Sequence, residues 1–257
     1  MQHFKALRTR TWLVISLILG FALVTFGCDT GKFFSDVLVS SKSLQSVNKE
    51  VLAVQYSYNA DGELLGFTEY EHDTKGNMTK FRSYDSNKEL SGYSELERDS
   101  KGNLTKVSHY YANGEFFSCS NFEYGSEGNK TKDNHYVNAN AEFSSTVYEY
   151  DLKGNQTKGS EYTANGELLA YSEYEYDSNG NWTKWSFYNA DGELSFKVEC
   201  EYDSNGNLTK WSQYTANGEL SGYAEYAYDS EGKITKKNDY DANGELYSYT
   251  VYLYKII

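Results

Sequence analysis

The sequence predicts an all-β fold, an antiparallel β-hairpin meander, from three observations. Seven glycines recur at intervals of 26 residues from Gly76 to Gly232. Tyrosine supplies 26 of the 257 residues, whereas proline is absent. A fixed period of this size indicates a repeat architecture, and aromatic residues favour strands whereas proline removes a ladder hydrogen bond. We therefore expect an elongated, twisted sheet, flat or curled so that a leucine and tyrosine face is concave.

Each 26-residue repeat contains two turns. One reads Asp177-Ser-Asn-Gly-Asn and the other Thr215-Ala-Asn-Gly-Glu. Both place glycine third in a three-residue loop, which is the chemistry of a type I turn followed by a left-handed residue. The glycines of the second turn also recur, from Gly62 to Gly244, and Lys88 and Asn140 replace glycine at two of these positions. Asparagine tolerates the left-handed backbone conformation better than lysine. Residues 56–257 therefore form about seven and a half repeats and 15 or 16 strands.

The turns fix a register that can be tested against the side chains. Pairing outward from the turns places Tyr176 opposite Trp182 and Trp211 opposite Tyr223, and Trp185 occupies the same repeat position as Trp211. Trp185, Trp211 and Tyr223 thus form an aromatic strip beside carboxylates, which could stack on sugar rings or contact apolar residues of a partner. Simple packing between strands is the alternative interpretation.

The N-terminal residues have the pattern of an export signal. Three basic residues precede an uncharged, mostly apolar run from Trp12 to Phe26. This run is shorter than the roughly 20 residues that span a membrane and suits the core of a signal peptide. Gly27-Cys28, which follows, resembles a bacterial lipobox. The resemblance implies that residues 1–27 are a lipoprotein signal peptide and that Cys28 carries a lipid anchor. An uncleaved anchor helix is the alternative.

Export sets the environment of the remaining chain. Residues 28–55 contain no repeat, and we expect the lipidated cysteine and a tether there. The repeat array would lie in the bacterial cell envelope, at the outer membrane or cell surface or in the periplasm. Removing three positive and no negative residues changes the formal charge from −13 to −16. An acidic protein has the wrong sign for phosphate, so we expect no nucleic-acid partner.

The repeats also resemble a known family. The segment Tyr174-Glu-Tyr-Asp-Ser-Asn-Gly-Asn-Trp-Thr and its counterparts at Tyr148 and Tyr226 resemble the Y-x-Y-D-x-x-G-N-L-T signature of Rhs/YD-repeat proteins. The resemblance implies a hairpin array with a surface role. In that family, longer arrays spiral into shells that enclose a toxin, but this chain is too short for a large shell. MORN-type hairpin repeats are a weaker resemblance.

No repeat breaks the template to create a unique acid–base pair or nucleophile, so we expect a protein that is not an enzyme and needs no cofactor. Asp177-x-Asn-x-Asn has the oxygen spacing of a calcium loop, but lysine replaces the middle residue in other copies, and a turn explains them all. We therefore expect no metal site.

Two histidines and two cysteines lie too far apart to share a metal ion or to form a disulfide. His109 and His135 lie two strands apart, roughly 10 Å, which is too far for joint zinc ligation. Cys119 and Cys200 lie about three repeats apart, so we expect free thiols.

The sequence therefore predicts a lipid-anchored, extracytoplasmic protein that presents an extended aromatic and acidic β surface for binding or adhesion, with a protein or glycan ligand. Two alternatives remain open. One is a structural spacer or coat element of the envelope. The other is an accessory or immunity protein associated with an Rhs-type toxin.

Overall fold

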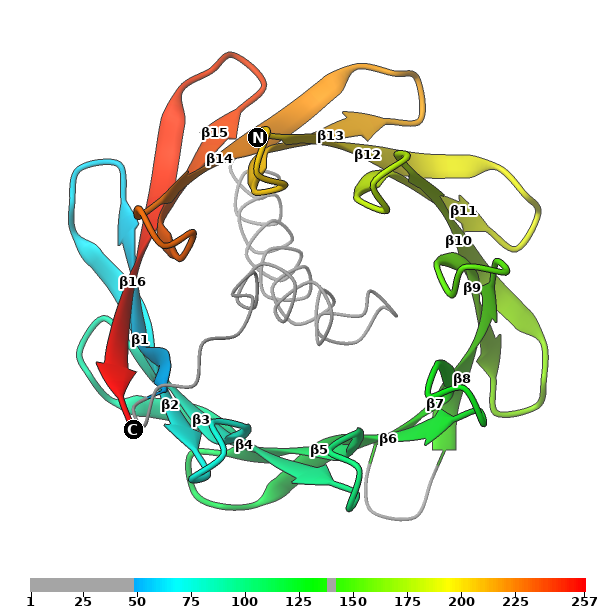
Figure 1. Ribbon diagram of the computed structural model, residues 1–257, viewed down its shortest axis with the longest axis horizontal. Helices are drawn as coiled ribbons and strands as arrows, with labels where there is room; N and C mark the ends of the chain where they lie inside the picture. The colour runs from blue at the N-terminus through cyan, green and yellow to red at the C-terminus, as the bar shows by residue number, and fades with distance from the viewer. Residues whose placement is uncertain (1–48, 138–141) are drawn as a thin grey trace, which may run out of the picture. The chain divides into compact units, whose positions relative to one another are not determined.

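The computed structural model describes residues 49–137 and 142–257, which form a closed barrel of 16 antiparallel strands (Figure 1). Each strand pairs with its sequence neighbours, and the last strand pairs with the first. The predicted signal peptide, Cys28 and Asn140 lie outside the described residues. The strands are β1 (Glu50–Asn59), β2 (Leu64–His72), β3 (Met78–Asp85), β4 (Leu90–Arg98), β5 (Leu104–Tyr111), β6 (Phe116–Tyr124), β7 (Lys130–Val137), β8 (Glu142–Tyr150), β9 (Gln156–Thr163), β10 (Leu168–Tyr176), β11 (Trp182–Asn189), β12 (Leu194–Tyr202), β13 (Leu208–Thr215), β14 (Leu220–Tyr228), β15 (Ile234–Asp241) and β16 (Leu246–Ile256).

The predicted hairpin meander is confirmed, but the elongated sheet is wrong because the sheet closes on itself. β1 and β16 pair along their lengths, from Glu50 opposite Ile256 to Asn59 opposite Ser248. Closure pairs both edge strands, whose backbone groups would otherwise be open to another chain. β1 begins at Glu50, so residues 50–55 of the expected tether lie in a strand.

The turns have the predicted chemistry. In the turn after β10, the Asp177 N–H donates to the Asn181 carbonyl oxygen at 2.9 Å, and the Gly180 N–H donates to the Asp177 carbonyl oxygen at 3.1 Å. The turn glycines of the described repeats have φ between +81° and +92°. Lys88 takes the same left-handed position with φ +67°.

A β-bulge beside each turn shifts the register by one residue. Tyr176 lies opposite Trp182 as predicted, but the next pair is Glu175 with Lys184, so Thr183 has no direct partner. Bulges bend and twist the strand that carries them. Their repetition at every hairpin supplies curvature that favours closure.

The same shift overturns the predicted aromatic strip. Trp211 lies opposite Ala224, whereas Tyr223 lies opposite Ser212. Because successive side chains point to opposite faces, Trp185 and Trp211 point to one face of the sheet and Tyr223 points to the other.

The two faces of the barrel wall differ in chemistry. One set of alternating positions holds the large buried side chains, such as Trp185 at 5% exposure and Val198 at 0%. The other holds exposed ion pairs such as Lys184 with Glu175. Side chains crowd together on the concave side of a closed sheet, so we assign the first set to the inner wall and the second to the outer wall.

Candidate functional site on the barrel wall

Lysine–tyrosine–tyrosine triads repeat around the outer wall. The Lys210 Nζ lies 4.4 Å from the centre of the Tyr223 ring, which stacks on the Tyr240 ring at 4.7 Å. A cation over an aromatic face contributes about 0.5–1 kcal/mol at exposed sites. Tyr223 therefore belongs to a triad rather than to a strip with tryptophans. Three further triads are Lys80–Tyr93–Tyr110, Lys158–Tyr171–Tyr188 and Lys236–Tyr249–Tyr58.

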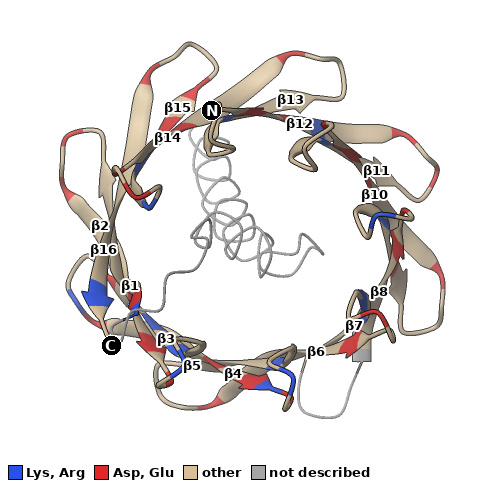
Figure 2. Ribbon diagram, viewed as in Figure 1, with Lys and Arg blue, Asp and Glu red and all other residues tan. Residues whose placement is uncertain are grey.

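Acidic residues flank these triads. Lys80 of the first triad reaches Glu95 at 3.0 Å, and Lys184, which lies on the same wall outside the triads, reaches Glu175 at 2.6 Å. Charged residues are distributed around the whole ring of strands and over the turns (Figure 2). Exposed pairs of this kind contribute only about 0–1 kcal/mol each, so their main effect is to make the outer wall polar.

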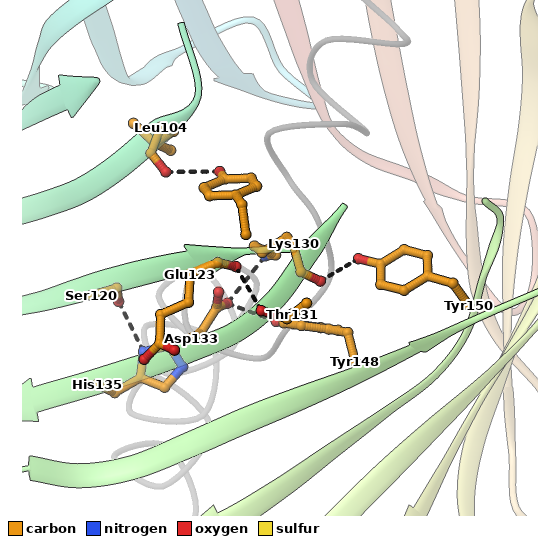
Figure 3. Close-up of polar contacts among 10 residues, drawn as sticks. Leu104, Ser120, Glu123, Lys130, Thr131, Asp133, His135, Tyr148 and Tyr150 are labelled. Carbon is orange, nitrogen blue, oxygen red and sulfur yellow. Dashed lines mark hydrogen bonds and ion pairs between the residues drawn. The ribbon is translucent and has the colours of Figure 1, made fainter. Parts of the chain in front are cut away.

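The inner wall contains a charged cluster that departs from the repeat template. The positions held by Met78 and Phe81 in β3 are held by Lys130 and Asp133 in β7. The Lys130 Nζ lies 3.1 Å from Asp133 Oδ2, and the two side chains are 9% and 4% exposed. The Tyr148 hydroxyl from β8 donates to the same oxygen at 2.6 Å (Figure 3). A buried carboxylate is thus held by a cation and a hydroxyl.

Two polar atoms of this cluster are buried without a hydrogen-bond partner. One is Asp133 Oδ1. The other is Nε2 of His135, whose Nδ1 lies 2.8 Å from Ser120 Oγ (Figure 3). Asp133 and His135 alternate with Asn134 along β7, so both side chains point to the inner wall. Each unsatisfied buried polar atom is costly and therefore needs an explanation.

Burial keeps the inner histidines neutral. It lowers the pKa of His109 to about 4, and His135 adds to the effect. It also lowers the pKa of His135, against a smaller opposing effect of Asp133 and a further lowering by Lys130. On β9, burial raises the pKa of Glu161, while a hydrogen bond with Ser144 opposes the shift. The two histidines in this part of the wall are therefore polar but uncharged near neutral pH.

The inner wall at β11 and β12 is aromatic. Trp185 packs edge-on against Phe196 with ring centres 5.1 Å apart and also contacts Phe187. Its Nε1 is buried without a hydrogen-bond partner. Val198 and Ala224, which lie opposite the two predicted tryptophans, are each 0% exposed. Trp185 is thus part of a packed layer and not of an exposed strip.

The remaining residues singled out in the sequence have defined places. His109 and His135 each pair with a serine on the inner wall, and the His109 Nδ1 lies 2.7 Å from Ser94 Oγ. Cys119 and Cys200 are both buried and are not bonded to each other. Cys119 points outward and Cys200 inward, because they occupy positions of opposite parity in equivalent strands.

The calcium-like loops use their carboxylates within the turn. Asp177 Oδ1 accepts the N–H groups of Asn179 and Asn181, and Oδ2 accepts the Asn181 Nδ2. Within residues 49–137 and 142–257, no group of three or more His, Cys, Asp or Glu side chains could hold a metal ion. In the same part of the chain, no helix is long and apolar enough to cross a membrane.

Sequence reasoning missed the inner-wall cluster of Lys130, Asp133, His135 and Tyr148. A signal was present, since lysine and aspartate replace residues that are apolar in most repeats. It was missed because residues three apart, such as Lys130 and Asp133, point to opposite faces of a regular strand, and only the bulge at Thr131 brings them to the same face.

Comparisons with solved structures support the fold. The porin-like protein from Bacteroides uniformis ATCC 8492 has a TM-score of 0.53 and 11% identity, over 79% of this chain and 98% of that chain. The porin-like protein from Bacteroides vulgatus ATCC 8482 has a TM-score of 0.51 and 13% identity, over 80% and 99%. The TcdB2–TccC3 structure matches with a TM-score of only 0.28 and 12% identity, over 70% of this chain and 13% of that chain. No family model and no curated protein sequence matches the chain. At these identities the two porin-like proteins show a shared barrel fold, and the Rhs/YD resemblance depends on sequence motifs.

Proposed function

We propose that this protein is an extracytoplasmic binding protein, held at a membrane by a lipid on Cys28, that presents its outer wall to a protein or glycan partner. The proposal assigns binding rather than catalysis. The observation that carries it is the recurrence of four lysine–tyrosine–tyrosine triads around one wall. A partner with regularly spaced groups could contact several triads at once, and such multivalent contact raises avidity.

The chemistry of the outer wall supports contact with water and with a polar partner. Barrels that face lipid carry an outward apolar band, whereas this wall carries ion pairs such as Lys80 with Glu95 and Lys197 with Glu199. Tyrosine rings give a large contact area at a low cost in conformational entropy and can also hydrogen-bond. The triads combine these rings with positive charge, and the flanking carboxylates add hydrogen-bond acceptors.

Glycan and protein arrays probed with the full-length protein in detergent test the binding role. The test variant is Tyr93→Ser/Tyr171→Ser/Tyr223→Ser, which removes the central ring of three triads. The matched control is Tyr111→Ser/Tyr247→Ser, which removes exposed tyrosines outside the triads. We expect binding that the triple variant loses and the control keeps. Silence on both arrays would favour the structural spacer.

The lipid anchor is tested separately. Inhibition of lipoprotein signal peptidase should cause a precursor that retains residues 1–27 to accumulate. A mature protein whose mass does not respond to the inhibitor would contradict the anchor at Cys28 without bearing on the outer wall.

A further inference from the structure

We propose that the inner wall of β7 forms a binding site for a neutral, polyhydroxylated ligand of the sugar or cyclitol class, with Asp133 and His135 as its hydrogen-bonding groups. This inner-wall site is independent of the triads on the outer wall. It consists of Lys130, Asp133, His135, Ser120 and Tyr148.

Asp133 is positioned to accept one more hydrogen bond. Its Oδ2 is engaged by the Lys130 Nζ at 3.1 Å and by the Tyr148 hydroxyl at 2.6 Å, which fix the carboxylate plane. Its Oδ1 is buried and has no partner. An ionised carboxylate only accepts hydrogen bonds, so a ligand at this oxygen must donate one.

His135 supplies the second contact. Its Nδ1 is engaged by Ser120 Oγ at 2.8 Å, and its buried Nε2 has no partner. In a neutral imidazole this nitrogen is either a donor or an acceptor, depending on the tautomer. A hydroxyl group can satisfy both cases. Asp133 and His135 are two residues apart on one strand face, roughly 7 Å between Cα atoms, so two hydroxyls of one ring-sized ligand could reach both.

The charges around the site select against ions. Lys130 balances Asp133, so a cation would meet the lysine and an anion would meet the carboxylate. The Lys130 Nζ lies 5.2 Å from the Phe122 ring centre and 4.5 Å from the Tyr148 ring centre, so two aromatic rings flank the pair. Aromatic rings beside a carboxylate suit a molecule with both hydroxyl groups and apolar C–H faces.

The buried ion pair is not needed to hold the strand in place. Equivalent positions in β3 carry Met78 and Phe81 in the same fold. Replacing a buried ion pair by apolar residues of similar size is often neutral or stabilising. A role in ligand binding therefore explains the pair better than a role in stability.

The test uses the full-length protein in detergent, with D-glucose, D-galactose, N-acetylglucosamine and myo-inositol as probes. Binding is measured by saturation-transfer NMR, and the ring nitrogens of His135 are followed by ¹H–¹⁵N correlation. The site variant is Lys130→Met/Asp133→Phe, which installs the β3 residues. The matched control is Lys237→Phe/Asp239→Ser, which removes the inner ion pair of β15. It installs the residues that β3 carries at the equivalent positions, Phe81 and Ser83.

We expect at least one probe to bind the native protein and to shift the His135 Nε2 resonance. Binding should weaken about tenfold or more in the site variant and persist in the control. Equal binding by all three proteins would overturn the proposal, and so would silence of all four probes with the native protein up to tens of millimolar. The His135 Nε2 resonance decides between the two walls, because a sugar bound only at the outer wall would give saturation transfer without shifting this resonance.

Discussion

At the scale of single residues, the repeated tyrosine, aspartate and asparagine each have a structural task. The Tyr228 hydroxyl donates to the Leu208 carbonyl oxygen at 2.9 Å, and Asp177 with Asn181 closes a turn. A carbonyl at the start of a strand would otherwise lack a partner within the sheet. The Tyr-Asp and Gly-Asn elements of the repeat are thus required by the fold and do not by themselves indicate a ligand. Equivalent tyrosine bonds are made by Tyr124, Tyr150, Tyr176, Tyr202 and Tyr254.

Tyr228→Phe should therefore destabilise the barrel by about 1 kcal/mol, since it removes one hydrogen bond and keeps the ring. The measurement is the free energy of unfolding in denaturant. Tyr223→Phe is the matched control, because its ring stacking on Tyr240 and its contact with Lys210 do not need the hydroxyl. Equal losses in both variants would contradict the assigned role.

Lys88→Gly should stabilise the protein by up to about 1 kcal/mol, because Lys88 holds a left-handed backbone that costs a non-glycine residue about 1–2 kcal/mol. Lys101 lies in a turn of the other series and lacks a positive φ, so Lys101→Gly should destabilise slightly by increasing the entropy of the unfolded chain. Opposite signs in thermal unfolding are the expected result. A loss of stability in both variants would show that the turn after β3 is not strained.

The inner histidines predict a pH dependence of stability. Because the pKa of His109 in the folded protein is about 4, below the usual 6.5, the unfolded chain binds more protons between these values. Stability should be complete above about pH 6.5 and fall as the pH decreases toward 4. The double variant His109→Gln/His135→Gln should flatten this slope. Glutamine is already present at the equivalent position of another repeat, as Gln213. An unchanged slope in the double variant would assign the dependence to other groups.

At the scale of strands and turns, much of the fold could be predicted and the orientation of side chains could not. Glycine spacing gave the repeat, and turn chemistry gave pairs such as Tyr176 with Trp182. The bulge at Thr183 was not foreseen, because a skipped residue changes neither the period nor the composition. The equivalent bulge at Ser221 in the β13–β14 hairpin shifts the pairs beyond it by one residue, so the predicted partner of Trp211 was wrong. The same uncertainty hid Asp133, whose departure from the template is visible in the sequence.

β7 allows the energetic role of its ion pair to be separated from its function. Lys130→Met leaves Asp133 buried without its cation and should cost about 3–5 kcal/mol. Adding Asp133→Phe should restore stability to the native value or above, because both residues then match β3. Denaturant unfolding of both single variants and the double variant measures the coupling between the two side chains. A double variant as unstable as Lys130→Met alone would mean that the pair is a structural requirement of β7.

At the scale of the whole molecule, closure is the property that local sequence could not supply. Each hairpin is compatible with an open sheet or with a ring. The outcome depends on the sum of bend and twist over 16 strands and on a seam between residues nearly 200 positions apart. At this seam Tyr58 stacks on Tyr249 with ring centres 5.0 Å apart, and Lys233 pairs with Glu50. The seam thus repeats the contacts of the other strand pairs.

A cross-link tests closure directly. Ser57 lies opposite Thr250 across the seam, and directly opposite residues in antiparallel strands are close enough for a disulfide. In an open sheet the two positions would be separated by 15 strand spacings, roughly 70 Å. Ser57→Cys/Thr250→Cys should therefore form an intramolecular disulfide on mild oxidation, detected as a linked peptide pair by mass spectrometry. Ser57→Cys/Ser172→Cys, which places the second thiol on distant β10, should not form this link. If neither pair links while the protein remains folded and monomeric, the strands form the elongated sheet that the sequence suggested; a link in the first pair alone requires the ring.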